Sequence, residues 1–339
     1  MKNLSSIGDL ARLYHTRQSN LSTKSKINTL SYEATTGIKK DLAKHLGGNT
    51  AIINQVEHKL ALLDAFKKNT TEAEGTLNAM QLAMQSIQDT IVDLGPALIS
   101  EASLSSDAQI DIRNAQSKEH LASTIRALNT TLAGKSLFSG SRTDTAPLPS
   151  ANALIDEISF EISGLSSLAD IETSIKNWFD APAGGAGYID NIYKGNLDTS
   201  HEFPTSERRT INISTNASSP AIREILRGLA LYTIAGSPQT NQDGNLQRGL
   251  LIAAGEALIH GNDLMSIERS RVGFSEELLK KEIAQNSSES SALSVSRNTM
   301  ITAEPFETAL SLKETESNLN NLYTLTARLS SLRLTDYLR

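Results

Sequence analysis

The 339-residue chain has no cysteine and few aromatic residues. The lack of cysteine excludes disulfides, thiolate metal sites and a cysteine nucleophile, and it suits a protein that has to stay free of cross-links before export. Aromatic residues make up 4% of the chain, with a single tryptophan. A large compact enzyme usually has more, so this composition favours thin helical bundles with aliphatic seams.

Long apolar runs are also missing. The most apolar stretch, LLIAAGEALI at 250–259, is short and contains Glu256, so we expect no membrane span. The first residues lack the apolar core of a cleavable signal peptide. The net charge is -6, and the 32 lysines and arginines do not gather into one run. We therefore expect no nucleic-acid partner.

The sequence contains no recognisable catalytic constellation. The six histidines are scattered, and neither an H-E-x-x-H motif nor a pair of catalytic carboxylates is present. The glycine-rich 184–187 lacks a P-loop lysine, and LFSGS at 137–141 lacks the G-x-S-x-G pattern of a hydrolase. We predict a protein that is not an enzyme, with no catalytic, cofactor-binding or metal site; His260 is expected to lie in a helical seam.

Helical periodicity dominates the N-terminal part. The clearest stripe alternates spacings of three and four: Leu63, Phe66, Thr70, Ala73, Leu77, Met80, Met84, Ile87, Ile91 and Leu94. Ile52 and Val56 extend it towards the N-terminus. The stripe predicts a rod of about 70 Å that ends or kinks at Gly95–Pro96.

Beyond this rod, a third helix and an insert are expected. Asp107 is a candidate N-cap for the helix, whose stripe is Leu121, Ile125, Leu128 and Leu132. Residues 142–218 carry four of the eight prolines and are predicted as an insert with one or two short helices. YIDNIYKG at 188–195 and RRTINIST at 208–215 have the alternation of short strands.

Helices resume after the insert. Ser219 and Pro220 mark a helix start. A second long stripe follows: Leu246, Leu250, Ala253, Ala257, His260, Leu264, Ile267, Arg271, Phe274 and Leu278. Pro305 either starts a new helix or kinks the old one.

Both ends of the chain carry leucine-rich helical stripes. We predict a mainly α fold: an elongated helical bundle with the N- and C-terminal helices paired as a coiled coil, plus a small mixed α/β insert rich in strands. The expected domains are 1–38 with 306–339 (terminal coiled coil), 39–141 with 219–305 (long-helix bundle) and 142–218 (insert). A non-helical connector is expected at 35–49, where glycines break the rhythm.

An isolated coil made from these ends would be marginal, because its N-terminal stripe includes Gln18, Ser25 and Asn28. Leucines off the main seams indicate that neighbouring subunits cover them. Leu4, Ile7, Tyr14 and Leu21 are expected to pair with Leu319, Leu322, Leu329 and Leu332. The predicted assembly interface comprises these eight residues together with Leu312, Tyr337 and Leu338. The alternative is a hairpin closed within one chain.

Three stretches are distinctive: LFSGSRTDTAP at 137–147, IYKGN to RRTINISTNASSPAIREILRGLA at 192–230, and LTDYLR at 334–339. They resemble the flagellin superfamily and, within it, the hook–filament junction family, also called hook-associated protein three. Thr36, Gly37, Lys39 and Lys40 match an early family motif. The usual Pro-Ser-Asp-Asp-Pro-like segment is replaced by KDLAKHLGGNT at 40–50, which leaves the connector's structure open.

The resemblance implies a secreted structural protein of the bacterial flagellum. It would be exported through the flagellar type III apparatus, with an export chaperone on its C-terminal helix. Copies would form a ring above the first hook-associated protein, and the ring would present a platform to flagellin or the filament-cap side. A flagellin, or an unrelated helical secretion-system scaffold, remains an alternative.

Overall fold

The structure is a computed structural model that describes residues 4–104, 115–197, 201–238, 240 and 243–337, with the side chains of 4–10, 13 and 329–337 excepted. It is mainly helical, as predicted, with long paired helices. Its contacts divide the chain into two compact units. Unit 1 consists of Met1–Leu62 and Ser288–Arg339, and unit 2 of Leu63–Ser287.

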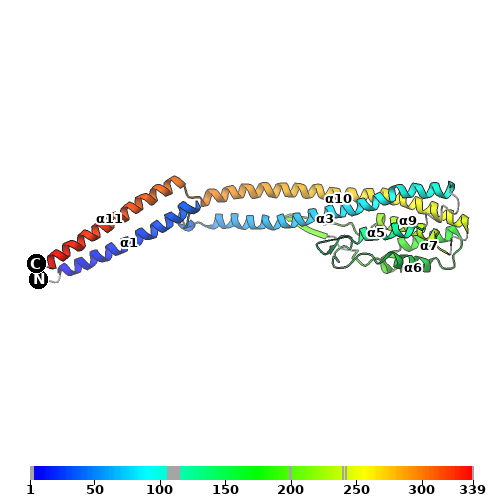
Figure 1. Ribbon diagram of the computed structural model, residues 1–339, viewed down its shortest axis with the longest axis horizontal. Coiled ribbons are helices and arrows are strands. Elements are labelled where there is room, and N and C mark those ends of the chain that lie inside the picture. The colour runs from blue at the N-terminus through cyan, green and yellow to red at the C-terminus, as the bar shows by residue number, and fades with distance from the viewer. Residues whose placement is uncertain (1–3, 105–114, 198–200, 239, 241–242, 338–339) are drawn as a thin grey trace. The chain divides into compact units, whose positions relative to one another are not determined.

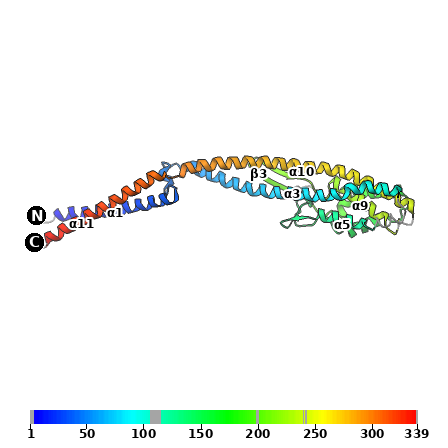
Figure 2. The same ribbon diagram turned by 45° about the horizontal axis from the view of Figure 1, so that its top comes forward.

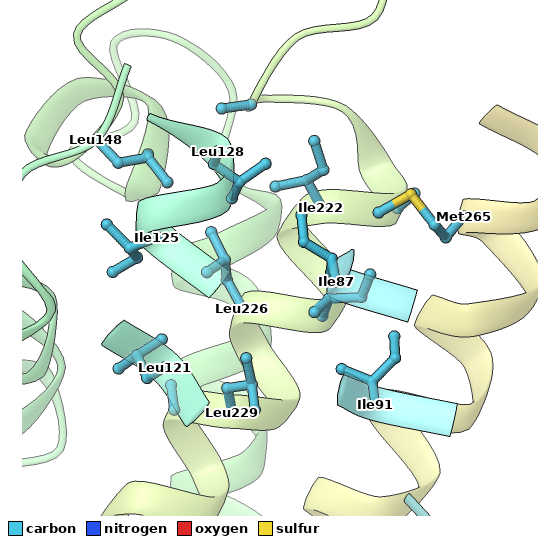
Figure 3. Packing of buried hydrophobic residues seen from close by; sticks show 14 of the residues in the cluster. Ile87, Ile91, Leu121, Ile125, Leu128, Leu148, Ile222, Leu226, Leu229 and Met265 are labelled. Carbon is cyan, nitrogen blue, oxygen red and sulfur yellow. The ribbon is translucent and has the colours of Figure 1, made fainter. Parts of the chain in front are cut away.

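The core of unit 2 lies where several helices meet. The long helices α3 (Ala51–Leu104) and α10 (Gly244–Ile301) extend through it, and α5 (Ser117–Leu128) and α9 (Pro220–Ala235) pack beside them (Figures 1 and 2). Figure 3 shows side chains from these four helices in one apolar cluster: Ile87 and Ile91 of α3, Leu121, Ile125 and Leu128 of α5, Ile222, Leu226 and Leu229 of α9, and Met265 of α10. Helix α9 is buried over most of its surface, which its apolar sequence requires.

The predicted stripe of α3 is confirmed. All ten positions from Leu63 to Leu94 are buried. Of the two alternatives expected at Gly95–Pro96, a helix end or a kink, the end is wrong, because α3 continues to Leu104 with this proline inside it. Ile52 is exposed, and Ile53 occupies the buried position instead.

The predicted stripe of α10 is wrong at four of its six positions beyond Ala257, where only Leu264 and Leu278 pack against the core. The buried positions there are Leu258, Gly261, Met265, Glu268 and Val272, so His260, Ile267, Arg271 and Phe274 face solvent. The buried stripe includes the carboxylate of Glu268, which accepts a hydrogen bond from Thr215 Oγ1 at 3.1 Å and pairs with Arg271 Nη1 at 2.8 Å. A buried carboxylate can occupy a core position when its hydrogen bonds and charge are paired. A prediction from hydrophobicity alone therefore places the core on a neighbouring face of the helix.

After α5 the chain forms a hairpin instead of another helical turn. Strands β1 (Thr131–Leu132) and β2 (Lys135–Ser136) are antiparallel, so Leu132 lies in a strand and not in the helix predicted for it. Ala133 and Gly134 form the turn with positive φ. The candidate cap Asp107 lies outside the described residues.

The segment 142–218 combines three helices with one hairpin. The helices are α6 (Ala151–Glu161), α7 (Leu168–Asp180) and α8 (Tyr188–Asn191); the strands are β3 (His201–Ser206) and β4 (Arg209–Ile213). The predicted strand at 208–215 is confirmed as β4, which pairs antiparallel with β3. The one predicted at 188–195 is wrong, because it begins with the helical turn α8. Tyr188 is fully buried there and packs against Trp178 and Phe179 of α7.

The hydroxyl of Tyr188 donates a hydrogen bond to the carbonyl oxygen of Ala217 at 2.7 Å. Substitution Tyr188→Phe leaves this buried carbonyl without its donor, and we expect the free energy of unfolding to fall by about 1–2 kcal/mol. Urea denaturation of the full chain measures the change. Tyr193→Phe is the matched control, because the Tyr193 hydroxyl donates a longer bond to Asn196 O, 3.1 Å, in a partly buried place. An equal loss in the two variants would contradict the expectation.

Candidate assembly interface

The first and last helices of the chain form a pair in unit 1. Helices α1 (Leu4–Thr36) and α11 (Pro305–Tyr337) lie side by side and run antiparallel (Figures 1 and 2). Helix α11 begins at Pro305, which settles the role of this proline as a helix start. The predicted pairing of the two terminal helices is therefore observed within one chain.

A short backbone ladder ties one end of this pair together. Lys39 N donates to Ile301 O at 2.8 Å, and Ala303 N donates to Gly37 O at 2.9 Å. Gly37 has a φ of +70°, a conformation that side chains with a Cβ rarely adopt. The buried carboxylate of Glu33 accepts hydrogen bonds from Lys40 N and Lys39 Nζ, both at 3.1 Å. The connector is thus non-helical here, as predicted, apart from the single turn α2 (Leu42–His45) that follows.

The side of α1 that loses exposure to α11 is mostly polar. Spacings of four and three connect its buried and half-buried residues Thr16, Asn20, Thr23, Ile27 and Leu30. Only the last two are large and apolar. This seam lies two positions away from the predicted stripe, whose polar members Gln18, Ser25 and Asn28 are exposed.

The facing side of α11 mixes leucine and threonine. Its buried and half-buried positions follow the same spacing: Thr308, Leu312, Thr315, Leu319, Leu322 and Thr326. Leu312, Leu319 and Leu322 thus lie in the seam with α1. Because threonine methyl groups bury little area and their hydroxyls need partners, the pair gains less from packing than a leucine seam would.

The structure separates the predicted interface residues into three groups. Leu312, Leu319 and Leu322 lie in the seam, whereas Tyr14 and Leu21 are 66% exposed. The expected pairing of Tyr14 and Leu21 with the C-terminal leucines is wrong within one chain, because the Thr16–Leu30 seam takes that place. Leu4, Ile7, Leu329, Leu332 and Tyr337 lie in the helices without described side chains, and Leu338 lies outside the described residues. Their part in an assembly interface stays a prediction.

The seam contains a buried polar group at Asn20. Oδ1 of Asn20 is buried and has no hydrogen-bond partner among the described residues. An unpaired buried amide oxygen costs about 1–3 kcal/mol. Spacing alone did not predict this group, because the predicted stripe placed Asn20 off the interface.

Replacing Asn20 by leucine removes that cost and adds apolar contact with α11. We expect Asn20→Leu to stabilise the α1–α11 pair by about 1 kcal/mol or more. Hydrogen exchange of the α1 and α11 amides measures it, with slower exchange as the expected result. Ser25→Leu, at an exposed position of the same helix, is the control and should leave the exchange nearly unchanged. Faster exchange in Asn20→Leu would contradict the seam described here.

The described residues offer little for small-molecule or metal chemistry. No group of three or more histidine, aspartate or glutamate side chains among them is placed to hold a metal ion. A cavity of about 280 Å³ lies beside α3 and β3 and is lined by Glu72, Lys135 and His201 among others. Burial lowers the pKa of His201, whose Nε2 lies 3.2 Å from Leu137 O, while Lys135 pairs with Glu72 at 2.6 Å. The polar groups of this cavity thus have partners within the chain, and their arrangement does not point to a particular reaction.

None of the helices in the described part of the chain is long and apolar enough to cross a membrane.

Comparison with known proteins gives a likeness of fold. No family model matches the sequence, and no curated protein matches it. A solved structure of FlgL from Bacillus cereus superposes with a TM-score of 0.50 at 13% identity, covering 72% of this chain and 99% of that one. A flagellar hook-associated protein from Vibrio parahaemolyticus gives a TM-score of 0.41 at 13% identity, over 72% of this chain and 96% of that one. The chain therefore shares the fold of Bacillus cereus FlgL over nearly the whole length of that protein.

Proposed function

We propose that this protein is a structural component of the bacterial flagellum that forms the junction between hook and filament. The observation that carries the proposal is the fold shared with FlgL over 99% of the FlgL chain. Fold alone does not set function, so the argument also needs features of this sequence and of its terminal helices.

The sequence supplies the first of these features. The stretches that resemble the hook–filament junction family, 137–147 and 192–230, fall on the segment after the β1–β2 hairpin and on the β3–β4 hairpin with α9. Both border the core of unit 2, where Phe138 and Ile211 are buried. The stretches that carry the resemblance therefore include buried residues of the unit 2 core.

The terminal helices α1 and α11 supply the second feature that supports the proposal. Their seam is half polar and includes Asn20 Oδ1, which has no hydrogen-bond partner among the described residues. Tyr14 and Leu21 on the outside of α1 are exposed. A pair that is weak inside and apolar outside gains order when further subunits cover it. We propose that copies assemble through α1 and α11 into a ring, which sits on the first hook-associated protein and presents a platform for flagellin.

The route to that place follows from the same proposal. The chain would be exported unfolded through the flagellar type III apparatus, with a chaperone on the C-terminal helix beforehand, and would act outside the cell without catalysis. A weakly paired α1 and α11 suits this route, because unfolding the two terminal helices before export then costs little free energy.

Deletion of the gene tests the junction role. We expect bare hooks by electron microscopy, with flagellin lost to the medium and detected there by immunoblot. Bare hooks with no major flagellin in cells or medium would identify the chain as the filament subunit instead. Normal filaments would end the proposal.

A further inference from the structure

An exposed stripe on α1 combines apolar and basic side chains. Tyr14, Arg17, Leu21 and Lys24 follow spacings of three, four and three, so they share one face of the helix. All four are exposed. Between residues 11 and 32, α1 carries four lysines and arginines and no acidic residue. We call these four residues the α1 stripe.

A second exposed stripe lies on α11 and has the opposite sign. Glu307, Leu310 and Glu314 follow spacings of three and four, and all three are exposed. Leu310 keeps 58% of its surface accessible in a helix that begins two residues before Glu307. We call these residues the α11 stripe.

The two stripes lie on opposite sides of the α1–α11 pair. Nζ of Lys24 lies 5.8 Å from the ring centroid of Tyr323, so the α1 stripe is on the Tyr323 side. Glu314 precedes Tyr323 by nine residues, which is about half a turn out of phase at roughly 100° per residue. One chain therefore cannot bring its own two stripes together.

The charged residues of the two stripes make no ion pair within the described part of the chain, although Nζ of Lys24 lies over the Tyr323 ring. Arg17, Lys24, Glu307 and Glu314 form no ion pair with any residue that the structure describes. In the same unit, by contrast, Arg297 pairs with Glu57 at 3.2 Å and Lys59 with Glu289 at 3.6 Å. The charges of the two stripes are thus available to a neighbouring molecule.

We propose that the α1 stripe of one copy docks on the α11 stripe of a second copy. Basic Arg17 and Lys24 then meet acidic Glu307 and Glu314, while Tyr14 and Leu21 cover Leu310. Because the stripes lie on opposite sides, the contact is head-to-tail and leads to a ring or a helical array, not to a two-fold dimer. The apolar residues supply most of the affinity, and the charges select the partner and the register. This inference rests on the proposed function, since it specifies how the copies meet.

Paired charge reversals test the docking in the full chain. Arg17→Glu with Lys24→Glu gives a variant with two acidic stripes, and Glu307→Lys with Glu314→Lys gives one with two basic stripes. Sedimentation velocity over a concentration series should show wild type assembling, each variant alone at least tenfold weaker, and an equimolar mixture restored, because the copies can then alternate. Lys67→Glu with Lys176→Glu changes two exposed lysines of unit 2 and should behave as wild type.

Single cysteines test the geometry, because the natural chain has none. Under mild oxidation, a mixture of Leu21→Cys and Leu310→Cys chains should form the mixed disulfide at least tenfold faster than Leu21→Cys with Leu82→Cys. Leu82 is a matched control because it is 64% exposed but belongs to unit 2.

The outcomes separate the docking from the proposed function. If wild type assembles while the charge variants assemble equally well, or the Leu82→Cys control cross-links as fast, the docking is overturned and a ring built through other surfaces stands. If wild type does not self-associate at any concentration, the ring and the docking both fail.

Discussion

Substitution Leu322→Asp is expected to weaken assembly strongly while unit 2 stays folded. Leu322 lies in the seam of α11 with α1, so aspartate would place an unpaired charge between the two helices. We expect a cost of about 2 kcal/mol to the α1–α11 pair, less than for a fully buried charge because this position is half-buried. That corresponds to assembly roughly thirtyfold weaker in sedimentation velocity.

The control for this variant is Asn320→Asp, which adds the same charge at an exposed position of the same helix. It should assemble nearly as wild type does. Because Leu322 belongs to unit 1, the thermal midpoint followed by near-ultraviolet signals from Trp178, in unit 2, should not move. A clearly lower midpoint would show that unit 2 depends on the terminal pair, which contradicts the account.

Substitution Gly255→Leu is expected to destabilise unit 2 severely. At this point α10 approaches α3 so closely that a Cβ on Gly255 would lie 2.6 Å from both Gly95 O and Ile99 Cγ1. One of these atoms belongs to the backbone and cannot rotate away, so the helices have to separate. We expect a loss of about 3 kcal/mol in the free energy of unfolding, measured by guanidinium denaturation.

Gly273→Leu is the matched control on the same helix. A Cβ at Gly273 would meet only Gln81 Nε2, at 3.8 Å. Leucine has the better helix propensity, so this variant should lose nothing and gain up to about 0.8 kcal/mol. Equal destabilisation of the two variants would mean that the close crossing at Gly95 and Gly255 does not limit the packing.

Periodicity predicted the core best where the buried face is continuously apolar. On α3 the ten stripe positions from Leu63 to Leu94 are buried, and Thr70 is the only polar residue among them. Counting the spacings therefore identified the correct face. On α10 the buried face includes Gly261 and Glu268, whereas Ile267 and Phe274 are exposed. Hydrophobicity chose the wrong neighbouring stripe there, because the stabilisation of Glu268 comes from Thr215 and Arg271, partners that the local sequence does not reveal.

Prediction from periodicity was limited in a similar way at the candidate interface between α1 and α11. Periodicity found the most apolar stripe of α1, which includes Tyr14 and Leu21, and the pairing of α1 with α11. It did not find that Thr16, Asn20 and Thr23 face α11. A spacing pattern identifies a face that favours burial, but not whether the same chain or another molecule covers it. Spacing could have revealed the α11 stripe, since Glu307, Leu310 and Glu314 repeat at three and four residues.

The short elements of 142–218 were hardest to predict for a different reason. The alternation in YIDNIYKG fits a strand, but Tyr188 is held by Trp178, Phe179 and the carbonyl of Ala217, contacts that favour the turn α8. Helix α8 has only four residues, so its tertiary contacts outweigh the strand propensity of its sequence. Ser219 and Pro220 were read correctly because a helix start depends on local backbone chemistry.

Immunogold electron microscopy of native flagella, with an antibody raised against the purified chain, tests the junction role most directly. A junction protein predicts label at one place on each flagellum, between the hook and the first turn of the filament. Label along the whole filament would make the chain a filament subunit, and no label on any flagellum would contradict a flagellar role altogether.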